Sequence, residues 1–314
     1  MMNIPYKDLD EPVTPMRPYM QFLIILGITL ASMIIGVIIA MCIIYMLYGS
    51  AVMNEALSFT ITSPKVLNSV WIFQIVSTTL PLFVAPVFFA NIIVQQPREY
   101  LKNNLKFSWL LILLVFAIMM ISSPLIELLS NINQKMHLSG FLQSLQDWMR
   151  KEEDLAEKAQ EGMMQMKTIG SLVFAIFVVG LLTALAEEFL FRGVIQTIFV
   201  RWTKNSHVAI WITAILFSAF HMEFFGFLPR VLLGALFGYF VYWSGSIWTS
   251  VWGHFVNNST VVIMVYLYQH KQTSISPDDQ HVFNSVGYII SFIIVLFLFW
   301  VYRDIALKKK PVQA

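Results

Sequence analysis

Long apolar stretches separated by short polar connectors run along almost the whole chain. A helix rises 1.5 Å per residue, so about 20 apolar residues cross the roughly 30 Å hydrocarbon core of a bilayer. The pattern predicts an all-α, polytopic transmembrane helical bundle with about eight spanning helices. The apolar stretches cover residues 22–48, 66–94, 109–129, 168–202, 207–225, 229–243, 247–268 and 283–302.

Two of these stretches contain features that predict irregular helices. The second holds Pro81 and Pro86, which predict a kink because proline cannot donate a backbone hydrogen bond. The fourth, 168–202, is longer than a bilayer requires. It is therefore either one long tilted helix or a helix that breaks near Gly193.

Composition supports a membrane protein and excludes other classes. Hydrophobic residues make up 58% of the 314 residues and charged residues 12%, against about 25% charged in soluble domains. The net charge of +2 is too small to indicate a nucleic-acid partner. The single cysteine, Cys42, excludes an internal disulfide and is expected to be a packing residue. The first 20 residues carry acidic side chains, so no cleavable signal peptide is expected.

The distribution of basic residues predicts the topology and the domain boundaries. Lysines and arginines are more numerous on the side that would hold both termini, once the nearly charge-balanced 130–167 segment is set aside, which predicts cytoplasmic termini. We expect a cytoplasmic tail at 1–20, a transmembrane bundle at 21–304 and a basic cytoplasmic tail at 305–314.

Residues 130–167 form a long polar connector with helical periodicity. Its pattern predicts an amphipathic helix that lies on the membrane or over the mouth of a site, or alternatively a solvated helical connector. The apolar positions are Phe141, Leu142, Leu145, Trp148, Met149 and Leu155.

Almost every ionisable side chain that lies inside an apolar stretch falls between residues 168 and 265, and five of these groups require an explanation. Each such group at membrane depth costs roughly 2.5 to 3.5 kcal/mol, so it is retained mainly where it is paired or functional. The groups are Glu187, Glu188, Arg192, His221 and His254.

The depths of these groups predict that they meet. Glu187 precedes Trp202 by 15 residues and His221 follows His207 by 14, which places both at about 21 to 23 Å from the turn that joins their helices. His254 lies at about 12 Å from the same side, and Asn258 is one turn deeper. The four side chains can therefore share one cavity.

The helical faces suggest different roles for the two glutamates. Glu187 and Glu188 point about 100° apart, and Glu188 has the spacing for an ion pair with Arg192, which leaves Glu187 facing the cavity. His254 and Asn258 are four residues apart and share a face. One carboxylate, two imidazoles and an amide can polarise a water molecule and stabilise an oxyanion, as general-base hydrolysis requires.

Each group also has a structural interpretation. A histidine in a helical bundle can be a hydrogen-bonded packing group, and Glu188 with Arg192 can be purely structural. Asn257 can replace Asn258 as the polar contact. His207, His270 and His281 sit at the ends of spans, where solvation at the membrane interface suffices. The agreement of depth, face and chemistry across three segments favours a functional site.

At these residues the sequence resembles the CPBP family, also called the Abi or CAAX-protease-like family, which includes the type II CAAX prenyl endopeptidases. The resemblance spans about residues 168–265, and the first 167 residues carry no diagnostic feature. Its three motifs correspond to Glu187, Glu188 and Arg192, then Phe217 and His221, then His254 and Asn258.

This resemblance implies an intramembrane protease of a bacterial cell membrane that acts on a membrane-embedded or lipid-anchored protein or peptide. Glu187 and His221 would activate water, and His254 with Asn258 would bind the oxyanion. Glu188, Arg192 and Phe217 would support them.

The resemblance leaves the metal question and the rival functions open. No cofactor is required in the preferred interpretation, but zinc bound by Glu187, His221 and His254 with one open position is the alternative. No His-Glu-x-x-His motif occurs in the sequence. A catalytically inactive membrane scaffold or bacteriocin-immunity-type protein of the same fold, or a small transporter, are the alternative functions; no inverted repeat favours transport.

Overall fold

The computed structural model describes residues 16–308 except 59, 138–139, 277–278 and 280–281. Within these residues every regular element is a helix and there are no strands, which confirms the all-α prediction. The predicted tails lie largely outside the described residues, as does His281. Of the tails, only residues 16–20 and 305–308 are described, and most of them belong to the first and last helices.

All eight predicted stretches are helical. Five helical stretches are long and apolar enough to cross a membrane, and the bent pair α5 and α6 makes a sixth. α11 has only 15 residues and is shorter than these spans. α13 has 23 residues, but it carries His254 and Asn258 and is not among the five. The described residues therefore form a multi-pass membrane bundle.

The first three spans have the following bounds. α1 covers Pro18–Leu57 and is kinked at Gly49. The second span joins α2 (Pro64–Gln74), η1 (Ile75–Thr79), α3 (Leu80–Phe88) and η2 (Phe89–Ile93). The third joins α5 (Leu110–Ile121) and α6 (Ser123–Gln134) across a 43° bend.

The prolines of the second span are accommodated by π-helical segments. η1 and η2 are π helices that lie just before Pro81 and just after Pro86. A π turn pairs a carbonyl with the N–H five residues on, so it can satisfy a carbonyl that proline, which has no N–H, leaves unpaired.

The fourth span is one continuous helical run from 169 to 203 and does not break near Gly193. Of the two alternatives, the long helix is the one observed. The run joins α8 (Ile169–Ala175), η4 (Ile176–Leu182), α9 (Thr183–Glu188), η5 (Phe189–Ile195) and α10 (Gln196–Thr203).

The remaining elements complete the bundle. Four of them follow the fourth span: α11 (Ser206–Phe220), α12 (Phe227–Ser244), α13 (Ile247–Gln269) and α14 (Ser285–Lys308). The short elements are α4 (Pro97–Leu101), η3 (Gly140–Leu142) and η6 (Phe224–Gly226). The polar connector contains α7 (Gln143–Met163).

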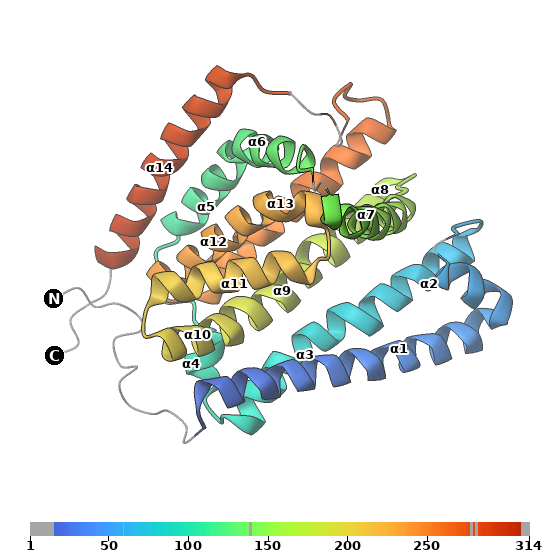
Figure 1. The fold of residues 1–314 in the computed structure, drawn as a ribbon, viewed down its shortest axis with the longest axis horizontal. Helices are drawn as coiled ribbons and strands as arrows, with labels where there is room; N and C mark the ends of the chain where they lie inside the picture. Colours follow the sequence, from blue (N-terminus) through green and yellow to red (C-terminus); the bar gives the residue numbers. More distant parts are fainter. Residues whose placement is uncertain (1–15, 59, 138–139, 277–278, 280–281, 309–314) are drawn as a thin grey trace.

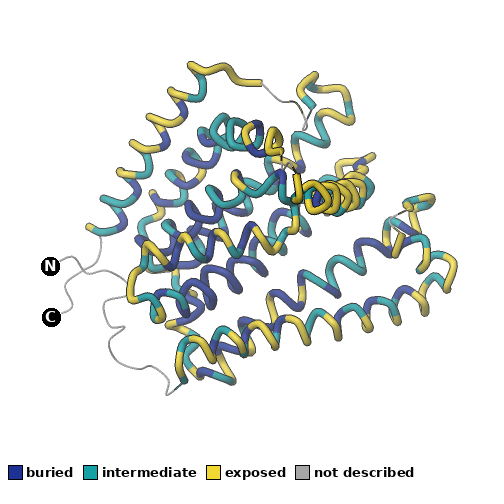
Figure 2. Tube along the Cα trace, viewed as in Figure 1, coloured by how far each residue is buried: buried dark blue, intermediate teal, exposed yellow. Residues whose placement is uncertain are grey.

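The helices form a central group flanked by outer spans. α1 lies beside α2 and α3 along one edge, α14 packs on α5, α6 and α12 along the other, and α9 to α13 lie between them (Figure 1). Buried positions gather in the central helices, whereas α1 and α14 are largely exposed (Figure 2). The ionisable residues of the fourth span therefore lie within protein.

The two ends of the bundle differ. α1 begins and α14 ends at the left of Figure 1, and α7 lies at the opposite end. The start of α1 and the end of α14 therefore lie at one end of the bundle and α7 lies at the other, and the cytoplasmic orientation of the termini stays a prediction. α7 packs against α2 and η6, so it lies over the end of the bundle where α11 finishes.

Candidate active site

The two glutamates lie at the end of α9, between two π-helical segments. η4 precedes them and η5 follows. Glu187 is 6% exposed and Glu188 is completely buried. Single π turns inside α-helices are frequent at functional sites because they alter how the side chains next to them are directed.

Three of the predicted site residues converge on one carboxylate oxygen. Glu187 Oε2 lies 3.8 Å from His221 Nε2 and 3.8 Å from His254 Nε2. That oxygen is buried and accepts no hydrogen bond from the described residues. Both separations exceed a direct hydrogen bond but suit a water molecule that contacts all three atoms.

His221 is the C-cap residue of α11. Its Nδ1 is 2.8 Å from the carbonyl oxygen of Phe217, so an Nδ1–H group donates there and leaves Nε2 as an acceptor that faces Glu187. The Phe217 ring lies edge-on to the imidazole at 4.9 Å. With 25% of its side chain exposed, His221 is the accessible member of the three, since Glu187 and His254 are nearly enclosed.

His254 is held from two directions in the interior. Its Nδ1 donates to Glu188 Oε1 at 2.8 Å. The ring stacks on Phe237, with centroids 5.0 Å apart and planes 15° from parallel. These contacts fix the imidazole so that Nε2 points to Glu187. A carboxylate that accepts from one ring nitrogen commonly orients a functional histidine in this way.

Glu188 is the centre of a buried hydrogen-bond network. Arg192 Nη1 donates to its Oε1 at 2.6 Å, which confirms the ion pair that the spacing predicts. Arg192 Nη2 donates to the carbonyl oxygen of Gly234 at 3.1 Å. The hydroxyl of Ser250 donates to Glu188 Oε2. Glu188 therefore does more than neutralise Arg192, because it also orients His254.

Ser250 is a site residue that sequence reasoning missed. It lies four residues before His254, on the same face of α13, so the spacing that joined His254 to Asn258 could also have identified it.

Phe217 contacts the site, and its supporting role stays a prediction. It lies under the Arg192 guanidinium at 4.3 Å and edge-on to His254 at 5.9 Å.

Asn258 lies apart from the other predicted site residues. Its Nδ2 donates to the carbonyl oxygen of Val179 at 3.1 Å, and its Oδ1 accepts from Asn257 at 3.2 Å. Among the described residues it forms no hydrogen bond with Glu187 or with either histidine. Asn258 therefore makes no hydrogen bond to the three convergent groups, and its role at the oxyanion stays a prediction.

The three convergent atoms lie farther apart than ligand atoms on zinc do. Two ligand atoms on tetrahedral zinc, each 2.0 to 2.1 Å from the metal, lie about 3.3 Å apart, which is closer than the 3.8 Å between Glu187 Oε2 and each imidazole. No group of three or more histidine, cysteine, aspartate or glutamate side chains in the described part of the chain is arranged to hold a metal ion.

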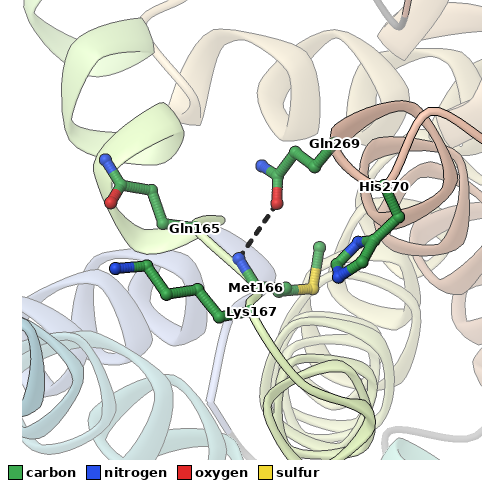
Figure 3. A pocket seen from close by; sticks show the side chains of 5 residues that line it. All are labelled: Gln165, Met166, Lys167, Gln269 and His270. Carbon is green, nitrogen blue, oxygen red and sulfur yellow. Dashed lines mark hydrogen bonds between the residues drawn. The ribbon is translucent and has the colours of Figure 1, made fainter.

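A separate pocket of about 430 Å³ lies where α13 ends and α8 begins, lined by Gln165, Met166, Lys167, Gln269 and His270 (Figure 3). Gln269 forms two hydrogen bonds there: its Oε1 accepts from Met166 N at 3.0 Å, and its Nε2 donates to Met164 O at 2.8 Å. Lys167 is about 30 Å from Glu187 along the fourth span. The pocket is therefore not part of the glutamate site.

Comparisons with known proteins agree with the resemblance that the three motifs predict. Residues 169–260 match the family model described as Type II CAAX prenyl endopeptidase Rce1-like, and this range contains every predicted site residue. "Uncharacterized protein YpbD" of Bacillus subtilis (strain 168) is 27% identical over 106 residues, which are 32% of this chain and 50% of that protein. No solved structure matches. The family resemblance is thus confirmed, and the chain aligns with half the length of this curated relative.

Proposed function

We propose that this protein is an intramembrane endopeptidase that hydrolyses a peptide bond in a membrane-associated protein or peptide. The observation that carries the proposal is the convergence of two imidazole Nε2 atoms on the unpaired oxygen of Glu187, at 3.8 Å each. The match of this region to an endopeptidase family supports the same reaction class.

Glu187 acts as the general base in the proposed reaction. A water molecule contacts Glu187 Oε2 and gives one hydrogen to the acceptor Nε2 of His221, which orients it. Glu187 removes the other proton as the water oxygen bonds to the scissile carbonyl carbon, and the electrons of the carbonyl π bond move to its oxygen. When the C–N bond breaks, Glu187 returns the proton to the leaving amine.

His254 stabilises the oxyanion in this scheme. The proposed scheme places a proton on both ring nitrogens of His254, whose imidazole lies between Glu187 and Glu188. Its Nδ1–H donates to Glu188, and its Nε2–H is then available to the developing oxyanion. Asn258 is proposed as a second donor through the amide hydrogen that does not bond to Val179.

The proposed substrate is membrane-embedded or lipid-anchored, because Glu187 lies on the apolar fourth span, within the bundle. The proposed setting is a bacterial cell membrane with both termini in the cytoplasm, and the proposed reaction needs no cofactor. The matching family is described as one of CAAX prenyl endopeptidases, and a prenylated carboxyl terminus is the first substrate class to test.

Replacement of Glu187 by glutamine tests the proposal. Glutamine keeps the shape but cannot accept the proton, so we expect cleavage to fall by about 10² to 10⁴-fold. Membrane proteomes of cells with the wild-type or the Glu187→Gln protein should differ by accumulated precursors, which identify the substrate for assays with purified protein. Equal amounts of inserted protein serve as the control.

Unchanged turnover in the Glu187→Gln variant would rule out this mechanism. If the biological effect persists in that variant without any cleavage, the same cavity acts as a peptide-binding scaffold instead.

A further inference from the structure

The loop that follows His221 is held by residues outside the region that matches the endopeptidase family. His221 ends α11, and Met222 follows in the left-handed region with a φ of 56°. The loop then reaches η6 and turns into α12. Because His221 is at the end of a helix, its position depends on what fixes this loop.

Asn133 of α6 binds the loop at two points. Its Nδ2 donates to the carbonyl oxygen of Phe224 at 2.8 Å, and its Oδ1 accepts from the backbone N–H of Leu228 at 2.6 Å. Asn133 is 3% exposed, so both bonds are shielded from water. One side chain therefore joins the two sides of η6.

α7 holds the same loop from the outer side. Glu153 Oε2 accepts from the backbone N–H of Phe225 at 3.0 Å. The Arg150 guanidinium lies 3.3 Å from the centre of the Phe225 ring, and the Trp148 ring lies 5.5 Å from Phe224. These contacts explain why a polar helix lies across this end of the bundle, and they combine hydrogen bonding with cation–π and aromatic packing.

An ion pair also links the loop to α12. Glu223 forms an ion pair with Arg230 of α12, and both side chains are about one-quarter exposed. Exposed ion pairs contribute little. Residues 221–228 are therefore restrained mainly by Asn133, by Glu153 and by the buried Ser218 hydroxyl of α11, which donates to the carbonyl oxygen of Phe227 at 2.8 Å.

We propose that α6 and α7 form a clamp that positions His221 for the reaction, with Asn133 and Glu153 as positioning residues. This inference rests on the proposed peptidase function, but the clamp itself is testable without any substrate. The clamp gives the polar connector a role in the active site, although the connector lies outside residues 169–260, which match the endopeptidase family. Neither residue touches the water or the substrate; both act through the loop.

Hydrogen–deuterium exchange of the full-length protein in lipid nanodiscs tests the clamp directly. Glu153→Ala removes the acceptor of the Phe225 amide, and Asn133→Ala removes that of the Leu228 amide. We expect the corresponding amide to exchange about tenfold faster or more in each variant, because a hydrogen bond to an acceptor is lost. Glu153→Gln keeps a carbonyl acceptor and should retain protection at Phe225.

Glu152→Ala is the matched control. Glu152 is the neighbour of Glu153 on α7, and its side chain forms no hydrogen bond or ion pair with any described residue. Exchange at Phe225 and Leu228 should remain at the wild-type rate. Wild-type exchange at both amides in Glu153→Ala and Asn133→Ala would overturn the clamp.

Kinetics on the substrate identified with Glu187→Gln test the positioning role. Displacement of His221 by about 1 Å can cost up to about 100-fold, so we expect kcat to fall by 10 to 100-fold in Glu153→Ala with a smaller change in KM. Glu153→Gln should restore kcat. Faster exchange with unchanged kcat would overturn the positioning role while leaving the peptidase proposal intact, and the failure of Glu187→Gln to reduce cleavage would instead overturn the peptidase proposal.

Discussion

The outer spans of this bundle are mostly exposed, whereas the central helices are surrounded by protein. α1 and α14 are the least buried of the spans and are among the most apolar, whereas α12 is the most buried and the least apolar. In water the apolar helices would be inside. Here the lipid-facing surface must be apolar, and polar side chains are kept where protein surrounds them. The polar content of a span is thus an indicator of its burial.

The charged groups show the largest contrast between the two regions. Arg192 and Glu188 are completely buried, whereas Lys308 and Asp304 form a pair of the same spacing at the exposed end of α14, where the lysine is 75% exposed. Arg192→Met leaves a buried carboxylate without its cation, so we expect a loss of about 3 to 5 kcal/mol of stability. Thermal unfolding in detergent measures it.

Lys308→Met is the control for that experiment, and it should change the unfolding temperature little, because water screens the exposed pair. Equal losses in the two variants would show that the central network has no special energetic role. The contrast between buried and exposed ion pairs would then fail.

Two glycines test packing in the same two regions. A Cβ on Gly234 of α12 would lie 3.0 Å from Ala214 Cα and 3.3 Å from Arg192 Nη2, whereas a Cβ on Gly27 of α1 would meet nothing within 4 Å. We expect Gly234→Ala to cost about 1 to 3 kcal/mol through overpacking. Gly27→Ala should be neutral or stabilise by up to about 1 kcal/mol, because alanine favours the helix.

The measurement is the unfolding midpoint of both variants under one set of detergent conditions. A destabilised Gly27→Ala would mean that another surface covers α1 at this position. A neutral Gly234→Ala would mean that α11 and α12 can separate freely.

Lys102 tests a third environment, the connector between the second and third spans. Its side chain is 8% exposed, and burial lowers the pKa of Lys102 from 10.5 to about 7. Between pH 7 and 10.5 the unfolded chain binds this proton and the folded chain does not, so the contribution of Lys102 to stability rises with pH in that window. Below pH 7 the folded state carries the full cost of the buried cation.

Lys102→Met removes this dependence on pH. We expect the unfolding temperature of the variant, relative to the wild type, to be highest near pH 6 and to decrease between pH 7 and 9.5. A constant difference across that range would contradict the lowered pKa.

The helices and the central convergence could be predicted because both follow from local spacing. Apolar run lengths located all eight helical segments. Rise per residue placed Glu187, His221 and His254 at compatible depths, and four-residue spacing gave the pair of Glu188 with Arg192. These are properties of single helices, which the sequence expresses directly.

The remaining features depend on contacts between distant segments. No local pattern marks Asn133 as the partner of Phe224 and Leu228, and the predicted oxyanion role of Asn258 did not anticipate its bond to Val179. The π segments around α9 were also not predicted, since their residues have the same apolar composition as ordinary helix. Long-range pairing has to be observed.

The wide turns of η4 and η5 have a consequence for how such a chain can vary. Each π turn accommodates one surplus residue inside a helical rod whose two ends keep their faces. The deletion or insertion of a single residue in either turn can therefore alter the aim of the α9 carboxylates while Ile169–Ala175 and Gln196–Thr203 stay anchored. The position of the Glu187 carboxylate can change in this way while the rest of the fold stays the same.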